Sequence, residues 1–258
     1  MPEGHTIHRL ARDHARDLVG KNLRVSSPQG RFDCSDLDGK NLVRIDAYGK
    51  HLVYVFGGRS HRYVHVHLGL FGKFFRREGV PPAPRPTTRM RVSTKHVTID
   101  LSGPTACEEL SRAELDRLLA RIGPDPLRGD ADLASAAARL AKKKTPIGAA
   151  LLDQSVVAGI GNVYRAEILF LHRIHPATPA NQISLERHAA LLDTTRRLLE
   201  RGVAYGRIVT VTGAGARAKK DNALYVYKRA ACKECGARID HTTVGGRTCY
   251  FCPDCQIR

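Results

Sequence analysis

The sequence predicts an α+β protein with a mainly β N-terminal part, a helical part and a small C-terminal metal-binding ribbon. Three observations carry this prediction. Up to about residue 118, apolar residues recur in short runs with a period of two, as in strands. Beyond that point, segments rich in Ala, Leu and Arg follow a helical period. Finally, five of the seven cysteines lie within the last 27 residues.

The N-terminal part opens with a helical pattern at residues 6–19 and continues with runs that predict strands. These runs are Asn41–Ile45, His51–Phe56, Tyr63–Leu68 and Lys95–Leu101. In the third run, Val64 and Val66 alternate with histidines, as in a half-buried strand. Gly57-Gly58 predicts a hairpin turn before this run, and the proline-rich stretch 81–86 predicts a loop.

The second half of the chain is predicted to be helical. Helical patterns cover residues 147–153, 163–172 and 184–202, and residues 212–222 predict a mobile basic loop. We therefore expect a first domain over 1–118, a second over 119–228 and a zinc finger over 229–258.

The C-terminal cysteines have the spacing of a metal site. Cys232 and Cys235 form one pair, Cys252 and Cys255 form a second, and 16 residues separate the pairs. Two such pairs present four thiolates to one tetrahedral Zn²⁺ in a closed structural site. Redox cysteines and an unmetallated loop are the alternatives. Val244-Gly245-Gly246-Arg247 predicts a hairpin turn between the pairs, with Arg247 near its tip. Cys34, Cys107 and Cys249 receive no role.

The charge balance indicates a polyanionic partner. The chain has 42 Lys+Arg against 25 Asp+Glu, a net charge of +17, and neutralising phosphates releases condensed counterions. A merely basic, solvated surface is the alternative. No secretory signal, membrane span or lipidation motif is visible, so a reducing cytoplasm is the expected location.

The N-terminus offers a nucleophile. Removal of Met1 would leave Pro2 with a secondary amine, and an α-amino group has a pKa of about 7.7–8.0. Such an amine can attack a sugar C1′ and form an iminium, and the Glu3 carboxylate can move protons at the same centre. An inert N-terminus is the alternative.

Several motifs occur in a fixed order along the chain. They are Met1-Pro2-Glu3-Gly4, Tyr48-Gly49-Lys50-His51-Leu52, His67-Leu68-Gly69-Leu70-Phe71-Gly72, Asp153-Gln154-Ser155-Val156-Val157-Ala158-Gly159-Ile160-Gly161-Asn162-Val163-Tyr164 and the four cysteines. Together they resemble the formamidopyrimidine-DNA glycosylase/endonuclease VIII family over essentially the whole chain. The N-terminal motif and Gly-Lys-His are similar to the endonuclease VIII branch, closest to endonuclease VIII-like proteins of actinobacteria.

This resemblance implies both a fold and a set of catalytic residues. The implied fold is a β-sandwich domain with flanking helices, followed by a helix–two-turn–helix domain that ends in a four-cysteine zinc ribbon. The implied activity is that of a bifunctional DNA glycosylase and abasic-site (AP) lyase. Pro2 would form the Schiff base and Glu3 would act as general acid/base. Lys50 would assist β-elimination and contact phosphate, unless it is only a solvated strand-end lysine. Arg247 would contact phosphate and assist δ-elimination.

Further residues are expected to hold DNA. Asn162 opens a helix after a glycine turn, where it would cap the helix and bind phosphate. Leu70 and Phe71, on a glycine-flanked turn, would wedge into the gap left by an extruded base, unless both are core residues.

The implied substrate is double-stranded DNA with an oxidised base, pyrimidines favoured, or an abasic site. The protein is expected to be a monomer without membrane contact, with one structural zinc. The alternatives are an enzyme for another lesion, such as a formamidopyrimidine, hydantoin or crosslinked base, and a non-catalytic binder of damaged DNA.

Overall fold

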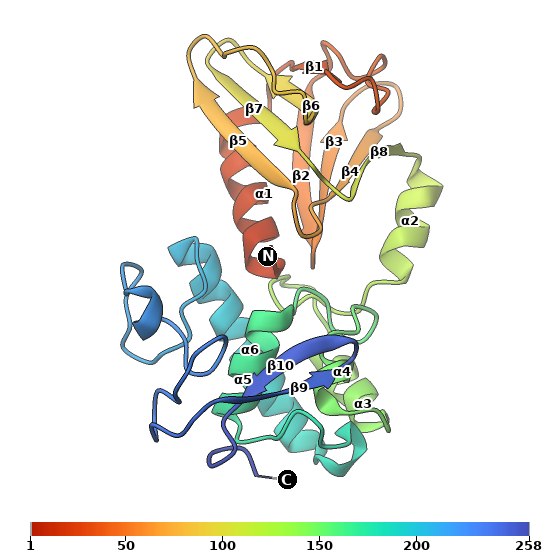
Figure 1. Cartoon of the computed structure of the whole chain (residues 1–258). Coiled ribbons are helices and arrows are strands. Elements are labelled where there is room, and N and C mark those ends of the chain that lie inside the picture. Colours follow the sequence, from red (N-terminus) through yellow and green to blue (C-terminus); the bar gives the residue numbers. More distant parts are fainter. Residues whose placement is uncertain (1, 258) are drawn as a thin grey trace. The chain divides into compact units, whose positions relative to one another are not determined.

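The computed structural model describes residues 2–257 and divides them into two compact units (Figure 1). The first contains Pro2 and Ile7–Ala120, and the second contains Glu3–Thr6 and the chain from Arg121 onward. No helix in the described part of the chain is long and apolar enough to cross a membrane.

The first unit contains two antiparallel sheets of four strands each. The strands are β1 (Arg24–Ser26), β2 (Leu42–Tyr48), β3 (His51–Phe56), β4 (Arg62–His67), β5 (Lys73–Glu78), β6 (Thr88–Ser93), β7 (Val97–Ser102) and β8 (Ala106–Leu110). One sheet has the order β1-β6-β7-β5 and the other β2-β3-β4-β8. Two helices, α1 (Gly4–Leu18) and α2 (Arg112–Ala120), flank them (Figure 1). This arrangement is the expected β-sandwich with flanking helices.

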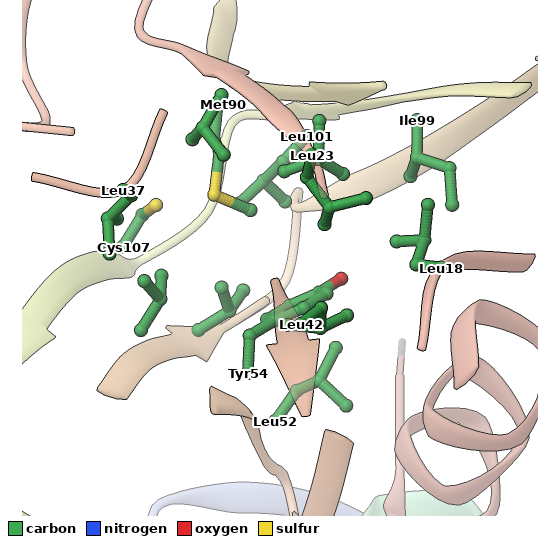
Figure 2. Close-up of a cluster of buried hydrophobic side chains, with 14 of the residues drawn as sticks. Leu18, Leu23, Leu37, Leu42, Leu52, Tyr54, Met90, Ile99, Leu101 and Cys107 are labelled. Atoms are coloured by element: carbon green, nitrogen blue, oxygen red, sulfur yellow. The ribbon is translucent and has the colours of Figure 1, made fainter. Parts of the chain in front are cut away.

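The core of the first unit lies between its sheets. On β3, Leu52 and Tyr54 point into this core, where they meet Met90, Ile99 and Leu101 of the opposite sheet (Figure 2). The alternate β3 residues pack on the other face against α2, in the cluster Val53, Val55, Tyr63 and Leu115. Strand β3 reads as a continuous apolar run because both of its faces are covered.

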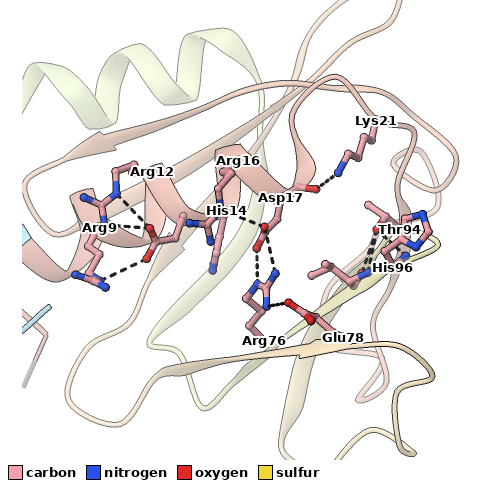
Figure 3. Close-up of polar contacts among 12 residues, drawn as sticks. Arg9, Arg12, His14, Arg16, Asp17, Lys21, Arg76, Glu78, Thr94 and His96 are labelled. Carbon is pink, nitrogen blue, oxygen red and sulfur yellow. Dashed lines mark hydrogen bonds and ion pairs between the residues drawn. The ribbon is translucent and has the colours of Figure 1, made fainter. Parts of the chain in front are cut away.

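Polar contacts join α1 to the sheets. His14 Nδ1 lies 2.7 Å from the Tyr54 hydroxyl inside the core, and burial lowers the pKa of His14 to about 4. Three residues along α1, Asp17 accepts hydrogen bonds from the Arg76 guanidinium at 2.5 and 3.3 Å (Figure 3). These bonds hold the pKa of Asp17 below its usual value.

The second unit is built around a buried helix. Its helices are α3 (Leu133–Ala141), α4 (Ile147–Ala150), α5 (Asn162–Leu171), α6 (Leu185–Tyr205) and the 3-10 turns η1 (Ala180–Gln182) and η2 (Lys220–Asn222), and its strands are β9 (Asp240–Val244) and β10 (Arg247–Phe251). One apolar cluster joins α3, α4, α5 and α6, and a second joins α5 to the cysteine ribbon. Because α5 contributes to both clusters, it is buried along almost its whole length.

The ends of the long helices follow local rules. Ser184 precedes α6 and its side chain accepts a hydrogen bond from the Arg187 amide, and Gly206 ends the helix with φ +68°. Asp132 caps α3 in the same way as Ser184 caps α6. The helix predicted over 147–153 ends at Ala150 instead. The side chain of Asp153 accepts a hydrogen bond from the Ser155 amide and competes with helix continuation.

Candidate active site

The first two predicted catalytic residues belong to different units. Met1 lies outside the described residues, so the terminus that its removal would create is not part of the structure. Pro2 is half-buried, precedes α1 and is counted with the first unit, whereas Glu3 is counted with the second. One peptide bond joins the predicted nucleophile to the predicted acid/base.

Glu3 is fully buried and its carboxylate caps helix α5. The amides of Gly161 and Val163 donate to its two oxygens at 2.8 and 2.9 Å, and the Tyr164 amide donates at 3.4 Å. The first amides of a helix have no partner within the helix and carry its positive dipole end, so an anion is stabilised there. Glu3 therefore has a fixed position, set by a helix that follows it by about 160 residues.

Glycines make room for this contact. A Cβ on residue 161 would lie 2.3 Å from Cδ of Glu3, and a Cβ on residue 4 would lie 2.9 Å from Cα of Gly159. The Gly4 amide also donates to the Gly159 carbonyl at 2.8 Å. The glycines of the Gly159-Ile160-Gly161 turn thus let the N-terminal segment approach α5 closely.

Asn162 does not cap α5, and this expectation was wrong. The capping position belongs to Gly161, and Glu3 supplies the side-chain acceptor. Asn162 is the first residue of the helix, largely buried, and its amide donates to the Thr248 carbonyl at 2.9 Å. Its side-chain oxygen accepts a hydrogen bond from Arg165. The side chain joins α5 to β10, and phosphate binding by Asn162 stays a prediction.

Arg165 and Glu167 of α5 are buried charged residues that sequence reasoning missed. The Arg165 guanidinium donates to the carbonyls of Gly148, Val244 and Thr248 at 3.1, 2.9 and 3.1 Å. It thereby holds the β9–β10 hairpin, and with it the backbone of Arg247, against α5. The only sequence signal was a charged residue inside an otherwise apolar helix.

Glu167 fixes the segment that leads into the cysteine ribbon. Its carboxylate accepts hydrogen bonds from the amides of Tyr225, Val226 and Tyr227 at 2.7, 2.9 and 2.8 Å, and from the Thr210 hydroxyl. Burial raises the pKa of Glu167, while these bonds act in the opposite direction. Glu167 also closes the base of the predicted basic loop, because it binds Thr210 before the loop and Tyr225 after it. The Thr210 amide closes the same base by donating to the Ala223 carbonyl at 2.8 Å.

Arg247 is exposed at the start of β10, directly after the hairpin turn. The turn glycines Gly245 and Gly246 have φ values of +60° and +69°, which a two-residue hairpin of this type requires. The tight turn thus leaves the guanidinium of Arg247 exposed at the start of β10. The structure places Arg247 where the sequence predicted it, near the hairpin tip.

Four cysteine sulfurs gather beside this hairpin. The sulfurs of Cys232, Cys235, Cys252 and Cys255 lie within 4.8 Å of one another, and three of their separations are 3.4, 3.5 and 4.0 Å. A regular tetrahedron with Zn–S bonds of about 2.3 Å has S–S edges of about 3.8 Å. The donor set and its spacing therefore fit one tetrahedral metal ion. Gln256 binds the knuckle to the helical core, accepting from the Cys252 amide and donating to the Ile174 carbonyl.

Lys50, Leu70 and Phe71 lie on turns of the first unit. Lys50 is half-buried and follows Gly49 (φ +60°) in the two-residue turn between β2 and β3. Leu70 and Phe71 lie between β4 and β5, with 57% and 80% of their surfaces exposed. The alternative that both are core residues is therefore excluded, and an exposed apolar pair on a turn suits a wedge.

The comparisons with known proteins agree with this architecture. Residues 1–109 match the formamidopyrimidine-DNA glycosylase N-terminal domain, and residues 122–213 match the H2TH domain of the same enzymes. Endonuclease 8 1 of Mycobacterium tuberculosis is 43% identical over 274 residues, covering 99% of this chain and all of that protein. The chain belongs to the formamidopyrimidine-DNA glycosylase/endonuclease VIII family. The family prediction is confirmed.

Other family members extend the likeness to the whole fold. Formamidopyrimidine-DNA glycosylase of Ligilactobacillus salivarius is 30% identical, with 100% of this chain and 98% of that protein covered. The Lactococcus lactis enzyme in complex with DNA containing N7-benzyl-Fapy-dG superposes with a TM-score of 0.84 at 26% identity, over all of both chains. The same enzyme bound to abasic-site DNA gives 0.83. The protein is accordingly a DNA glycosylase of base excision repair.

Proposed function

We propose that this glycosylase is bifunctional and uses the N-terminal amine of Pro2 for both base excision and strand cleavage. The proposal depends chiefly on Glu3, the residue next to Pro2, whose buried carboxylate is held in place by three amides at the start of α5. The neighbouring amine would have an anion at a defined position. The Lactococcus lactis family member, crystallised with DNA that contains a modified base or an abasic site, supports damaged DNA as the substrate.

The proposed chemistry follows from the amine. The Pro2 nitrogen attacks C1′ and the damaged base departs with the electron pair of the glycosidic bond. The nitrogen then loses its proton, the C1′–O4′ bond breaks with its electron pair going to O4′, which takes up a proton, and the ring-opened C1′–nitrogen iminium remains. Loss of a C2′ proton then expels the 3′ phosphate, which is β-elimination. Loss of a C4′ proton expels the 5′ phosphate, which is δ-elimination. Lys50 would assist the first elimination and Arg247 the second, through a guanidinium that can pair with phosphate.

Glu3 would act mainly as an anion in this scheme. An ionised carboxylate only accepts hydrogen bonds, whereas a protonated carboxyl group also carries a hydrogen that needs an acceptor. Three amide donors therefore favour the ionised form of Glu3. An anion beside the iminium stabilises the positive charge, and it can accept the proton of the attacking amine and pass it to O4′ as the sugar ring opens.

We further infer one structural zinc and a preference for oxidised pyrimidines. The four cysteines hold the zinc, which would supply no chemistry beyond fixing the hairpin that carries Arg247. The 43% identity to an endonuclease 8 supports the pyrimidine preference over that for 8-oxoguanine.

Borohydride trapping tests the nucleophile. The processed protein should form a covalent adduct with an abasic-site duplex, and Pro2→Gly should lose most of it while still binding the duplex. A protein that retains Met1 should also fail, because its Pro2 nitrogen is then an amide. Full trapping by the unprocessed protein would overturn the assignment.

A panel of duplexes tests the substrate. Base release from thymine glycol, 5-hydroxyuracil and dihydrouracil should exceed release from 8-oxoguanine and formamidopyrimidine. Product ends from the same reactions show whether δ-elimination follows β-elimination. A faster release of 8-oxoguanine than of every pyrimidine lesion would reverse the proposed preference.

A further inference from the structure

Histidines line one face of β3 and β4 beside the turn that carries Lys50. His51 Nδ1 lies 2.9 Å from His65 Nε2, and their rings are stacked with centroids 5.1 Å apart. His67 pairs with His51 in the strand register, with ring centroids 5.0 Å apart. The three imidazoles thus form one continuous array at the Lys50 end of the sheet.

A carboxylate ends the array on the next strand. His65 Nδ1 lies 3.0 Å from a carboxylate oxygen of Glu108, which pairs with His65 in the register of β4 and β8. A carboxylate can only accept, so Nδ1 of His65 carries the hydrogen. In a neutral His65, Nε2 then accepts from Nδ1–H of His51. The hydrogen bonds therefore leave Nε2 of His51 as the nitrogen that gains or loses a proton.

Packing alone does not require these histidines. Farther along the same face, Val53, Val55 and Tyr63 form an apolar cluster under Leu115 of α2. Imidazoles replace apolar side chains only toward the Lys50 turn, although His65 is 4% exposed and a buried polar group costs stability unless it is hydrogen-bonded. β-Branched residues would suit these strand positions better.

The other charged groups on this face have partners of their own. Arg44 pairs with Asp46 on β2 at 2.8 Å, and Arg112 pairs with Asp116 on α2 at 2.9 Å. The carboxylate of Glu114 binds Ser111 at the start of α2. Burial, followed by the charges of His65 and Lys50, lowers the pKa of His67. The positive charge of Lys50 therefore acts on at least one imidazole of the array.

We propose that Glu108, His65 and His51 form a hydrogen-bonded relay that sets the protonation state at the turn carrying Lys50, and thereby the pH range of strand cleavage. This inference rests on the proposed role of Lys50 in elimination. When Nε2 of His51 gains a proton, its Nδ1–H stays bonded to His65 and the carboxylate of Glu108 stabilises the positive charge. Glu108 and His65 are positioning residues that act through His51.

Proton positions on the free protein test the relay without any DNA. Long-range ¹H–¹⁵N spectra of histidine-labelled protein should show His51 and His65 as Nδ1–H tautomers when neutral, with the His51 signals assigned by their loss in His51→Gln. A neutral His51 that carries its hydrogen on Nε2 would overturn the relay.

The pH profile of cleavage tests its consequence. For a pre-formed abasic-site duplex in single turnover, the ratio of cleaved product to borohydride-trapped adduct isolates elimination from Schiff-base formation at each pH. Glu108→Gln keeps an acceptor for His65 but removes the charge that stabilises protonated His51. In the proposed relay the neutral form of His51 supports elimination beside Lys50, so the acid limb of this ratio should move to lower pH by roughly half to one unit.

Glu109→Gln is the matched control. Glu109 is the next residue on β8 and pairs with Arg62 instead of an imidazole, so its profile should superimpose on that of the parent protein. An unmoved acid limb in Glu108→Gln, or an equal loss at every pH together with a lower melting temperature, would overturn the relay. If the parent protein forms no trapped adduct, the proposed function fails, while the spectra still decide the relay.

Discussion

Glu3 has a structural role and a proposed chemical role in one side chain. Its carboxylate satisfies backbone amides at the start of α5 and at the same time lies next to the proposed nucleophile. Sequence reasoning predicted the second role from the N-terminal motif and assigned the first to Asn162. A cap that comes from a residue far away in the chain leaves no local signal, because capping rules compare only neighbouring positions.

Gly161→Ala should displace Glu3 without straining the backbone. Gly161 has φ −120°, which alanine adopts readily, but the new Cβ would lie 2.3 Å from Cδ of Glu3. We expect a loss of stability of roughly 1–3 kcal/mol, as for overpacking, and a loss of most borohydride trapping. Gly129→Ala is the control, because nothing lies within 4 Å of its new Cβ. Unchanged trapping in Gly161→Ala would show that the position of Glu3 does not matter.

His14 should make stability depend on pH. Its pKa is about 4 in the folded protein and 6.5 in the unfolded chain, so the unfolded chain binds more protons between these values. This contribution to stability is present above pH 6.5 and is lost as the pH falls toward 4. Between pH 7 and pH 5, the free energy of unfolding of His14→Gln should fall by roughly 2 kcal/mol less than that of the parent protein, as measured by urea unfolding. The exposed His61→Gln should follow the parent, and an equal loss in His14→Gln would refute the assignment.

At the scale of elements, α5 organises the second unit. Its first turn binds Glu3, Arg165 binds the β9–β10 hairpin and Glu167 binds the segment before the ribbon. Each of these charged groups is buried and has several hydrogen-bond partners, as buried charges require. Glu3 and Arg247, two of the residues proposed for chemistry, lie on segments that α5 holds, whereas Lys50 lies on a turn of the first unit.

Glu167→Gln should loosen the segment at residues 225–227. The donors around residue 167 now share the two oxygens of a carboxylate, and glutamine offers them only one. Some of the buried N–H groups would therefore lose their acceptor. We expect a destabilisation of roughly 2–4 kcal/mol and faster amide exchange at these residues. Glu200→Gln, exposed on α6, is the control and should change neither quantity. Unchanged exchange at residues 225–227 would contradict the anchoring role.

The predictability of each element depended on its surroundings. The run His51–Phe56 coincides with β3, and the helix expected at 163–172 is α5 within one residue, because both are apolar and well covered. Strand β5 was missed, since its sequence is Lys-Phe-Phe-Arg-Arg-Glu and it lies at a sheet edge, where charged side chains remain solvated. Strands β1, β6 and β8 were also missed. Strand β1 has only three residues, and β6 (Thr-Arg-Met-Arg-Val-Ser) and β8 (Ala-Cys-Glu-Glu-Leu) carry few large apolar residues.

At the scale of the whole molecule, the net charge and the proposed zinc ribbon would both act on DNA. A surplus of +17 favours a polyanion in general, and releasing counterions gives affinity without choosing a site. Binding at one particular place on DNA requires groups with fixed positions, and the ribbon would fix the position of Arg247. The ribbon in turn packs on α5 through Cys232 and Cys252, which are buried with Phe170 and Tyr225.

Cys252→Ser should therefore lower zinc content and DNA affinity together. Structural zinc binding supplies folding free energy to small ribbons, so loss of one thiolate should release the metal and free the β9–β10 hairpin. Losing the proposed charge-assisted phosphate contact of Arg247 should cost roughly 1.5–3 kcal/mol, or about 10- to 150-fold in Kd. Metal analysis and binding to an abasic-analogue duplex at one fixed salt concentration measure both effects. Cys34→Ser, in the first unit, should keep its zinc and its affinity. A zinc-free Cys252→Ser protein with the parent's Kd would show that the hairpin needs no metal to hold DNA.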